Sequence, residues 1–215
     1  MQEDVKICTV NVGMIGTNCY IVYKENGDIK KEAIIVDPGD DAHKIVDVID
    51  ELEVNPVAIL LTHGHFDHIL ATNKIADKYN IKVYAHKAEQ ELLLDAEKNL
   101  SKGYRRDCKV INARSLEDNE EIILAGIKIK VLNTPGHTIG SSCYLLEESN
   151  ILLSGDMLFR ESVGRTDFPT GSDSDILNSL NNVLMKLDDD IEVYPGHGPS
   201  STIGYERKNN MYVRF

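Results

Sequence analysis

Residues 60–68 of the chain, LLTHGHFDH, place three histidines and one aspartate within six positions directly after an apolar run. The apolar run, 57–61, is short and uninterrupted, as is typical of a buried strand. Imidazole nitrogens and carboxylate oxygens are ligands that zinc takes, and iron and manganese accept them too. Side chains at these adjacent and alternate positions cannot all point in one direction. The stretch therefore predicts two neighbouring metal ions better than one.

Three later loops each add one residue of ligand type directly after a predicted strand. They are residues 133–138 (NTPGHT), 152–156 (LLSGD) and 193–198 (VYPGHG). Glycine lets the backbone pass close to an ion in an otherwise strained turn. Each loop alone is a weak signal, but the repeated order of strand, small-residue turn and ligand predicts one shared site. The seven candidate ligands are His63, His65, Asp67, His68, His137, Asp156 and His197.

The composition is that of an ordinary globular protein and restricts the partners. The chain has 215 residues, a formal net charge of −12 and 42% hydrophobic residues. We expect one domain spanning 1–215, because no linker or low-complexity segment divides the sequence. The acidity and the lack of a basic cluster argue against nucleic acid as a partner. The start of the sequence lacks a signal-peptide pattern, and no apolar run is long enough to span a membrane. The four scattered cysteines are typical of reduced thiols. We therefore expect a cytoplasmic protein.

The hydrophobic patterning predicts an α/β protein in which two sheets pack face to face with helices outside. Residues 101–119 form a surface connection, or alternatively a lid over the site. Strands are expected at 5–12, 18–23, 33–36, 57–61, 81–85, 121–124, 127–132, 142–146, 151–154 and 191–194. Helices are expected at 41–53, 69–79, 87–100 and 172–187.

Local signals refine these boundaries. Asp40 or Asp41 is expected to cap the first helix, and Asp67 to occupy the N-cap of the helix that follows the ligand stretch. An Asn-Gly pair at 26–27 predicts the turn between the second and third strands. His43 and His86 are assigned to helix regions, His86 directly before the helix expected at 87–100, and are interpreted as surface residues.

The four ligand motifs occur in the order found in the metallo-β-lactamase superfamily, and the chain resembles that superfamily over nearly its whole length. Residues 18–20, 155–159 and 164–167 further resemble the short, single-domain hydrolases of the glyoxalase II (hydroxyacylglutathione hydrolase) branch. The larger glyoxalase II enzymes have an additional helical segment that binds glutathione, and we expect it to be absent because this sequence ends at Phe215.

The resemblance implies a four-layer αβ/βα sandwich with the metals at one edge. It implies one metal on His63, His65 and His137, and a second on Asp67, His68 and His197. Asp156 would bridge the two metals. The expected cofactors are two divalent ions, zinc foremost, with iron or manganese as alternatives.

The chemistry expected of such a site is hydrolysis of an acyl-thiol substrate. Water between two cations ionises near neutral pH, and the resulting hydroxide attacks the thioester carbonyl while one metal polarises the carbonyl oxygen. Asp67 is both a ligand and the nearest carboxylate, so it is the residue expected to orient the hydroxide. Arg165 and Asp167 form either a buried ion pair that holds the loop after Asp156 or a substrate contact.

Other functions fit the same residues less well. Persulfide dioxygenases resemble this branch, share a stretch like 164–168 and hold a single iron through two His and one Asp. In that alternative His63, His137 and Asp156 bind iron and the other four candidates have no role. Zinc lactamases that use a cysteine ligand need that cysteine at the position of Asp156, which makes this class less suitable. The negative net charge argues against a nuclease. A flavodiiron protein usually has glutamate in place of His65, and a structural zinc module has a closed site of four ligands.

Overall fold

Two six-stranded sheets form the framework of the protein, and a computed structural model describes residues 4–25 and 31–213. In the first sheet the strands follow one another in sequence order, antiparallel as far as β3 and parallel from β3 to β6. These strands are β1 (Val5–Val12), β2 (Thr17–Lys24), β3 (Lys31–Val36), β4 (Val54–Leu60), β5 (Lys82–His86) and β6 (Arg114–Leu116). The Asn-Gly turn expected at 26–27 lies outside the described residues.

The second sheet contains the later strands in the order β14-β13-β10-β9-β8-β7. It is mixed as well, because β10 and β13 run parallel whereas the other pairs are antiparallel. Its strands are β7 (Glu121–Leu124), β8 (Ile127–Asn133), β9 (Ser142–Leu146), β10 (Ile151–Gly155), β13 (Glu192–Pro195) and β14 (Ser201–Thr202). A small separate ribbon is formed by β11 (Leu158–Phe159) and β12 (Ser162–Val163).

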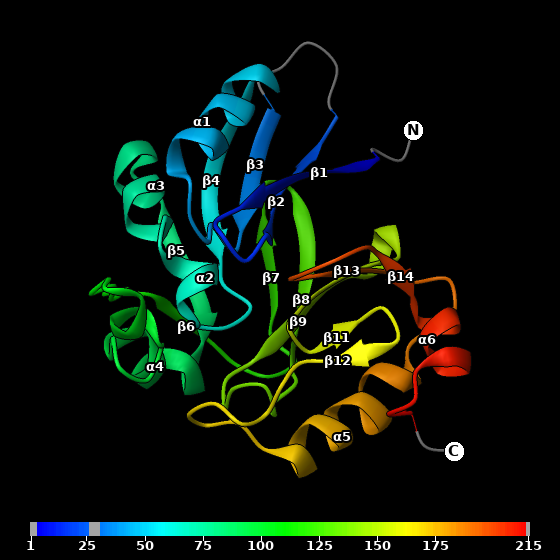
Figure 1. Cartoon of the computed structure of the whole chain (residues 1–215). Coiled ribbons are helices and arrows are strands. Elements are labelled where there is room, and N and C mark those ends of the chain that lie inside the picture. Colours follow the sequence, from blue (N-terminus) through cyan, green and yellow to red (C-terminus); the bar gives the residue numbers. More distant parts are fainter. Residues whose placement is uncertain (1–3, 26–30, 214–215) are drawn as a thin grey trace.

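Three apolar clusters show that the layers are helix, sheet, sheet and helix. The central cluster joins residues of both sheets, for example Ile34 and Tyr144. A second cluster lies between the first sheet and the helices α1 (Ala42–Glu51) and α3 (Thr72–Tyr79). A third lies between the second sheet and the helices α5 (Asp173–Asn182) and α6 (Ile203–Asn209). The two helix pairs lie on opposite outer sides (Figure 1), which confirms the predicted α/β sandwich.

The helix expected at 87–100 is wrong in length. The chain forms a 3₁₀ turn, η1 (Lys87–Glu89), and a short helix, α4 (Gln90–Leu94), and then leaves the helical conformation at Asp95. The Asp95 side chain accepts hydrogen bonds from the backbone amides of Glu97 and Lys98. Such local side-chain bonds compete with helix continuation.

The helix expected at 69–79 is divided in two. The structure has α2 (Phe66–Ile69) followed by α3, and the amide of Ala71 between them donates to the carbonyl of Pro38 rather than along a helix. His65 therefore occupies the N-cap position of α2, and Asp67 lies in its first turn. The expectation that Asp67 is the N-cap is wrong, which leaves its carboxylate free to face the site.

Two other boundaries differ from the sequence expectation. Asp41 does precede α1, but its side chain accepts a hydrogen bond from the amide of Gly13 and makes no cap bond. Strand β4 begins at Val54 and includes Pro56, where the pairing with β3 is irregular because proline has no amide hydrogen to donate. The described residues contain no helix long and apolar enough to cross a lipid bilayer.

Candidate metal centre

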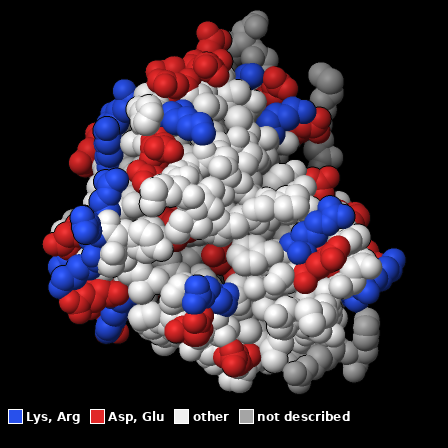
Figure 2. Space-filling model, viewed as in Figure 1, with Lys and Arg blue, Asp and Glu red and all other residues white. Residues whose placement is uncertain are grey.

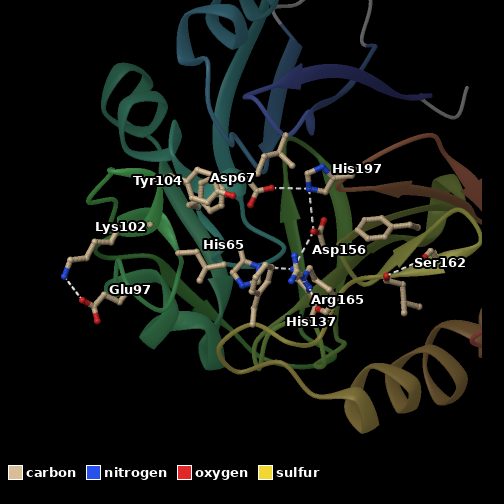
Figure 3. Close-up of a pocket in the computed structure, with 17 residues that line it drawn as sticks. His65, Asp67, Glu97, Lys102, Tyr104, His137, Asp156, Ser162, Arg165 and His197 are labelled. Atoms are coloured by element: carbon tan, nitrogen blue, oxygen red, sulfur yellow. Dashed lines mark hydrogen bonds and ion pairs between the residues drawn. The ribbon is translucent and has the colours of Figure 1, made fainter.

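The seven candidate ligands all lie in segments that directly follow strands. His63 and His65 follow β4, and Asp67 and His68 are on α2, which continues the same segment. His137, Asp156 and His197 follow β8, β10 and β13. The carboxyl ends of strands from both sheets meet at one edge of the sandwich, where His65, Asp67, His137, Asp156 and His197 point toward one another (Figure 3).

The side chains form three compact groups in which the ligand-type atoms lie within 4.8 Å of one another. The groups share His63 and His68, so they form one continuous cluster rather than separate sites. The structure thus brings all seven residues together from four separate stretches of the chain. The groups are His63, His65 and His137; His63, His68 and Asp156; and Asp67, His68 and His197.

Asp156 lies in the middle of this cluster. Its Oδ1 is 3.4 Å from His68 Nε2, and its Oδ2 is 3.5 Å from His137 Nε2 and 3.6 Å from His197 Nε2. Asp67 Oδ2 lies 3.1 Å from His197 Nε2 and 3.5 Å from His68 Nε2. Asp156 therefore contacts imidazoles from both sides of the cluster, whereas Asp67 contacts those of one side.

Several of these atoms are buried and have no hydrogen-bond partner among the residues that the structure describes. They are the Nε2 atoms of His63, His65 and His68, and Oδ1 of Asp156. A buried polar atom without a partner costs about 1–3 kcal/mol. His63, His68 and Asp156 belong to one of the three groups, so their unpartnered atoms need a compensating group, whereas at His65 it is Nδ1, 2.9 Å from His137 Nε2, that faces the cluster. Nitrogen and carboxylate oxygen donors that converge in this way fit a divalent cation.

Hydrogen bonds fix which imidazole nitrogen is available in three of the histidines. His68 Nδ1 lies 3.0 Å from the Asp37 carboxylate, which can only accept a hydrogen. His137 Nδ1 donates to the carbonyl of Arg165 at 2.7 Å. Thr62 Oγ1 donates its one hydrogen to Asp37, so at 3.1 Å it accepts from His63 Nδ1. In the neutral form of each ring the lone pair is then on Nε2, the nitrogen that would ligate a metal, and in His137 that nitrogen lies 2.9 Å from His65 Nδ1.

The electrostatics of the histidines match this arrangement. Burial lowers the pKa of His63 well below its ordinary value, and the neighbouring imidazoles of His68 and His137 lower it further. Burial, together with His137, lowers the pKa of His65 to about 3. Both rings are therefore neutral at pH 7, the state in which imidazole binds metals.

The carboxylates create a strongly negative region beside these neutral rings. Burial raises the pKa of Asp67 and Asp156, but the neighbouring histidines, His68 foremost, together outweigh that effect, and both pKa values lie below the ordinary value for aspartate. Burial lowers the pKa of His68, yet the carboxylates of Asp67, Asp156 and Asp37 move it well above its ordinary value. The cluster thus favours positive charge at its centre.

Asp37 was not identified from the sequence as part of the site. It follows β3, is 2% exposed, and accepts hydrogen bonds from the amide and the hydroxyl of Thr62 in addition to its contact with His68. The signal was present, because residues 37–39 (DPG) repeat the order of strand, polar residue and small-residue turn seen at the ligands.

Glu89 is the second residue that sequence reasoning missed. It is fully buried, and its carboxylate accepts hydrogen bonds from the amides of Gly64 (2.7 Å) and Gly140 (2.8 Å) and from Thr138 Oγ1 (3.0 Å). These partners lie next to His63, His65 and His137. Glu89 therefore joins the two loops that carry those histidines, although it lies in a stretch whose charge pattern is that of a surface helix.

The start of β2 holds the loop that carries His197. Asn18 donates from its amide to Gly196 O and from its side chain to the carbonyls of Pro195 and Gly198, while Tyr20 Oη donates to Pro195 O. A Cβ at Gly196 would lie 2.1 Å from Asp156 Oδ1, so only glycine fits here. The 18–20 motif thus fixes one ligand loop from the opposite sheet.

Arg165 and Asp167 form an ion pair, but the expectation that the pair is buried is wrong. The guanidinium contacts both carboxylate oxygens at 2.7 Å, and the side chains are 60% and 65% exposed. They lie in the loop between β12 and α5, at the rim of the site, where Arg165 also stacks on Phe168 at 3.9 Å. The loop is held instead by the bond from His137 to the Arg165 carbonyl.

A pocket of about 1180 Å³ opens above the cluster. His65, Asp67, His137, Asp156 and His197 form its base. The surface around the central hollow is mostly uncharged in the space-filling view (Figure 2). Residues 102–104, in the segment expected as a connection or a lid, form part of its wall.

Of the two histidines interpreted as surface residues, one is buried. His43 is exposed on α1, as expected. His86 ends β5 and is 4% exposed, and its Nδ1 accepts a hydrogen bond from the amide of Ala88. The surface interpretation is wrong because His86 belongs to the buried strand β5 and not to a helix.

Comparison with known proteins places the chain in a family. The sequence profile of the metallo-beta-lactamase superfamily matches residues 12–197. Hydroxyacylglutathione hydrolase GloC of Haemophilus influenzae is 30% identical over 91% of this chain and 92% of the relative.

Two solved structures agree closely with the fold. The BLEG-1 B3 metallo-beta-lactamase has a TM-score of 0.90, 37% identity and coverage of 97% of this chain and 99% of its own. TTHA1623, in a di-iron-bound form, has a TM-score of 0.84, 32% identity and coverage of 96% and 100%. With the profile match, the sandwich fold and the cluster of histidines and aspartates at its edge, the chain belongs to the metallo-beta-lactamase superfamily.

Proposed function

We propose that the protein is a dinuclear metal-dependent hydrolase of the glyoxalase II type that acts on an acyl thioester. The observation that carries the proposal is the central position of Asp156, whose two oxygens contact imidazoles of both outer histidine groups. One carboxylate in that position can serve two cations, whereas a mononuclear site leaves part of the cluster without a function. The di-iron form of TTHA1623 supports two metals, and the name of GloC supports the substrate class.

In this proposal, His63, His65 and His137 would hold one cation, Asp67, His68 and His197 would hold the other, and Asp156 would serve both. Two such cations would polarise the acyl carbonyl and lower the pKa of water at the site. Zinc is the metal proposed, and iron or manganese suits the same nitrogen and oxygen donors.

The residues of the chain supply the remaining roles. Asp67 faces the pocket and is held by a hydrogen bond from Thr17 Oγ1 at 3.1 Å, so it is placed to accept a proton from the attacking water. The water oxygen bonds to the acyl carbon, the carbon–sulfur bond breaks, and the thiol leaves with a proton. The products are a carboxylic acid and a free thiol, and no oxidant is consumed.

The test combines a thioester panel with metal analysis of the purified protein. We expect hydrolysis of thioesters with about two divalent ions per chain, and Asp156→Ala should lower kcat at least about 1000-fold while the circular dichroism spectrum is unchanged. Asp77→Ala, an exposed aspartate on α3, is the control and should retain full activity. Full thioester hydrolysis by Asp156→Ala would falsify the proposal.

Two other reactions are measured in the same experiment. A persulfide dioxygenase would contain a single iron on His63, His137 and Asp156 and would consume oxygen in the presence of a persulfide. The similarity to BLEG-1, a B3 metallo-beta-lactamase, makes a β-lactam the second candidate substrate, because the same attack on a carbonyl opens its ring. The presence of Asp156 argues only against lactamases that require a cysteine ligand. A chromogenic cephalosporin tests this candidate directly.

A further inference from the structure

The walls of the pocket are built from large apolar side chains. The chain contains four phenylalanines, and three of them, Phe66, Phe159 and Phe168, line this pocket. Its volume of about 1180 Å³ exceeds the range of roughly 300–1,000 Å³ usual for small-molecule sites. This concentration of aromatic rings beside the reacting groups needs an explanation in terms of the substrate.

One wall combines residues from three separate segments. Tyr104, on the 3₁₀ turn η2 (Ser101–Tyr104), stacks on Phe66 of α2 with ring centroids 4.0 Å apart. Ile15, between β1 and β2, and Leu100 continue the same surface. Tyr104 is 50% exposed and Ile15 is 48% exposed. Apolar side chains that gather half-exposed around a cavity are typical of a binding surface.

The remaining aromatic rings lie against the histidines of the metal centre. The Phe168 ring meets the His65 ring edge-on at 5.5 Å, and the Phe159 ring meets the His197 ring edge-on at 6.1 Å. Val163 on β12 lies in the same lining. An apolar group in contact with these rings therefore begins directly beside the position of the reacting carbonyl.

The cations of the pocket are already paired. Among its described lining residues the Lys and Arg side chains are Lys102, which pairs with Glu97, and Arg165, which pairs with Asp167. Both pairs are at the rim. A charged acyl group would therefore find no uncompensated cation on these walls, whereas an apolar acyl group would bury its surface against them.

We propose that the thioester cleaved at this site carries a bulky apolar acyl group, aromatic or aliphatic, of about the size of phenylacetyl or hexanoyl. The inference rests on the proposed thioesterase function and specifies its substrate class. The acyl chain lies between the Phe66–Tyr104 pair and Phe168, with its carbonyl at the metal centre. The thiol carrier extends toward the open mouth of the pocket.

The experiment uses N-acetylcysteamine thioesters, so that the thiol is constant and only the acyl group changes. The acyl groups are acetyl, lactoyl, hexanoyl and phenylacetyl. We expect kcat/KM for the hexanoyl and phenylacetyl thioesters to exceed that for acetyl at least about 30-fold, because each buried methylene contributes a several-fold factor. Equal or higher values for acetyl or lactoyl would overturn the inference.

Two variants test whether the aromatic side chains of the pocket wall cause the preference for a bulky apolar acyl group. Tyr104→Ala and Phe168→Ala should each lower the ratio of phenylacetyl to acetyl kcat/KM at least about fivefold. Ile123→Ala, a 73% exposed residue on β7 away from the pocket, is the matched control and should leave the ratio and the activity unchanged. An unchanged ratio in both wall variants would contradict the placement of the acyl group.

A binding measurement separates this inference from the proposed chemistry. Ketone analogues, in which a CH₂ group replaces the thioester sulfur, cannot be hydrolysed. Calorimetry on the metal-loaded protein should show at least about tenfold tighter binding of the phenylacetyl analogue than of the acetyl analogue. Hydrolysis without this preference overturns the inference alone. Failure to hydrolyse any thioester overturns the proposed function and the inference together.

Discussion

The carboxylate of Asp37, after β3, contacts two residues of the ligand stretch after β4, Thr62 and His68. One oxygen accepts the amide of Thr62, and the other accepts the Thr62 hydroxyl and lies 3.0 Å from His68 Nδ1. Through Thr62 it also sets the orientation of His63. Partners that orient a metal-ligating imidazole typically change metal affinity 10–100-fold when they are removed.

We therefore expect Asp37→Asn to weaken binding of the divalent ions about 10–100-fold. An amide nitrogen facing Thr62 or His68 would replace an acceptor by a donor, and the rings of His63 and His68 would lose their fixed orientation. Competition with a chelator measures the affinity. Asp77→Asn on the exposed face of α3 should behave as the wild type. Wild-type affinity in Asp37→Asn would show that Asp37 has no such role.

At the scale of elements, the segment 87–94 shows why part of the structure could not be predicted. The sequence there has the charge density of a solvated helix, but the fold turns Glu89 into the interior between two ligand loops. The contacts of Glu89 are with residues 25 to 51 positions away in the sequence. The local sequence pattern carries no information about contacts between residues so far apart. The strands and the ligands in the loops after them are local features, and these could be predicted.

The buried position of Glu89 has a measurable consequence for stability. Burial raises its pKa to about 7 from an ordinary value of 4.5, against the opposing effect of its hydrogen bonds from Gly64, Thr138 and Gly140. Between these two pH values the folded protein keeps a proton that the unfolded chain has released. The free energy of unfolding therefore falls as the pH rises through this window, by roughly 3 kcal/mol at most.

Glu89→Gln should remove this pH dependence. We expect the wild type to lose stability relative to Glu89→Gln as the pH rises from 4.5 to 7.5, measured by urea unfolding of the metal-free proteins. Glu91→Gln, at an exposed position on α4, should follow the wild-type curve. If the Glu89→Gln and wild-type stabilities keep a constant difference over the whole pH range, the titration of Glu89 is not responsible.

At the scale of the whole molecule, the site depends on how the two sheets are joined. Tyr144 on β9 is fully buried between the sheets and donates from its hydroxyl to the carbonyl of Leu61, at 2.7 Å, just before the first histidines. Ser142 N donates to Thr62 O in the same region. These bonds fix the loop after β4 against the second sheet.

Tyr144→Phe should lower the free energy of unfolding by about 1–3 kcal/mol, because the Leu61 carbonyl loses a buried donor while the ring packing is kept. Urea unfolding measures the change. Tyr212→Phe, near the end of the described chain, is the control and should be within about 0.5 kcal/mol of the wild type. A Tyr144→Phe variant as stable as the wild type would show that this bond contributes nothing.

The sequence predicted the sandwich and the residues that gather at its edge because each strand and its ligand turn is a short, self-contained pattern. The structure shows that His63, His137, Asp156 and His197 do meet. The pocket walls were not predicted, because Ile15, Phe66, Tyr104 and Phe168 come from segments with no common pattern. Their arrangement is a property of the whole fold.

The most direct test of the account is the number and position of the metal ions. Elemental analysis of the purified protein, with anomalous diffraction from its crystals, should find two divalent ions per chain. One should lie among His63, His65 and His137, the other among Asp67, His68 and His197, with Asp156 in contact with both. A single ion held by His63, His137 and Asp156, or no ion at this edge of the sandwich, would contradict the account.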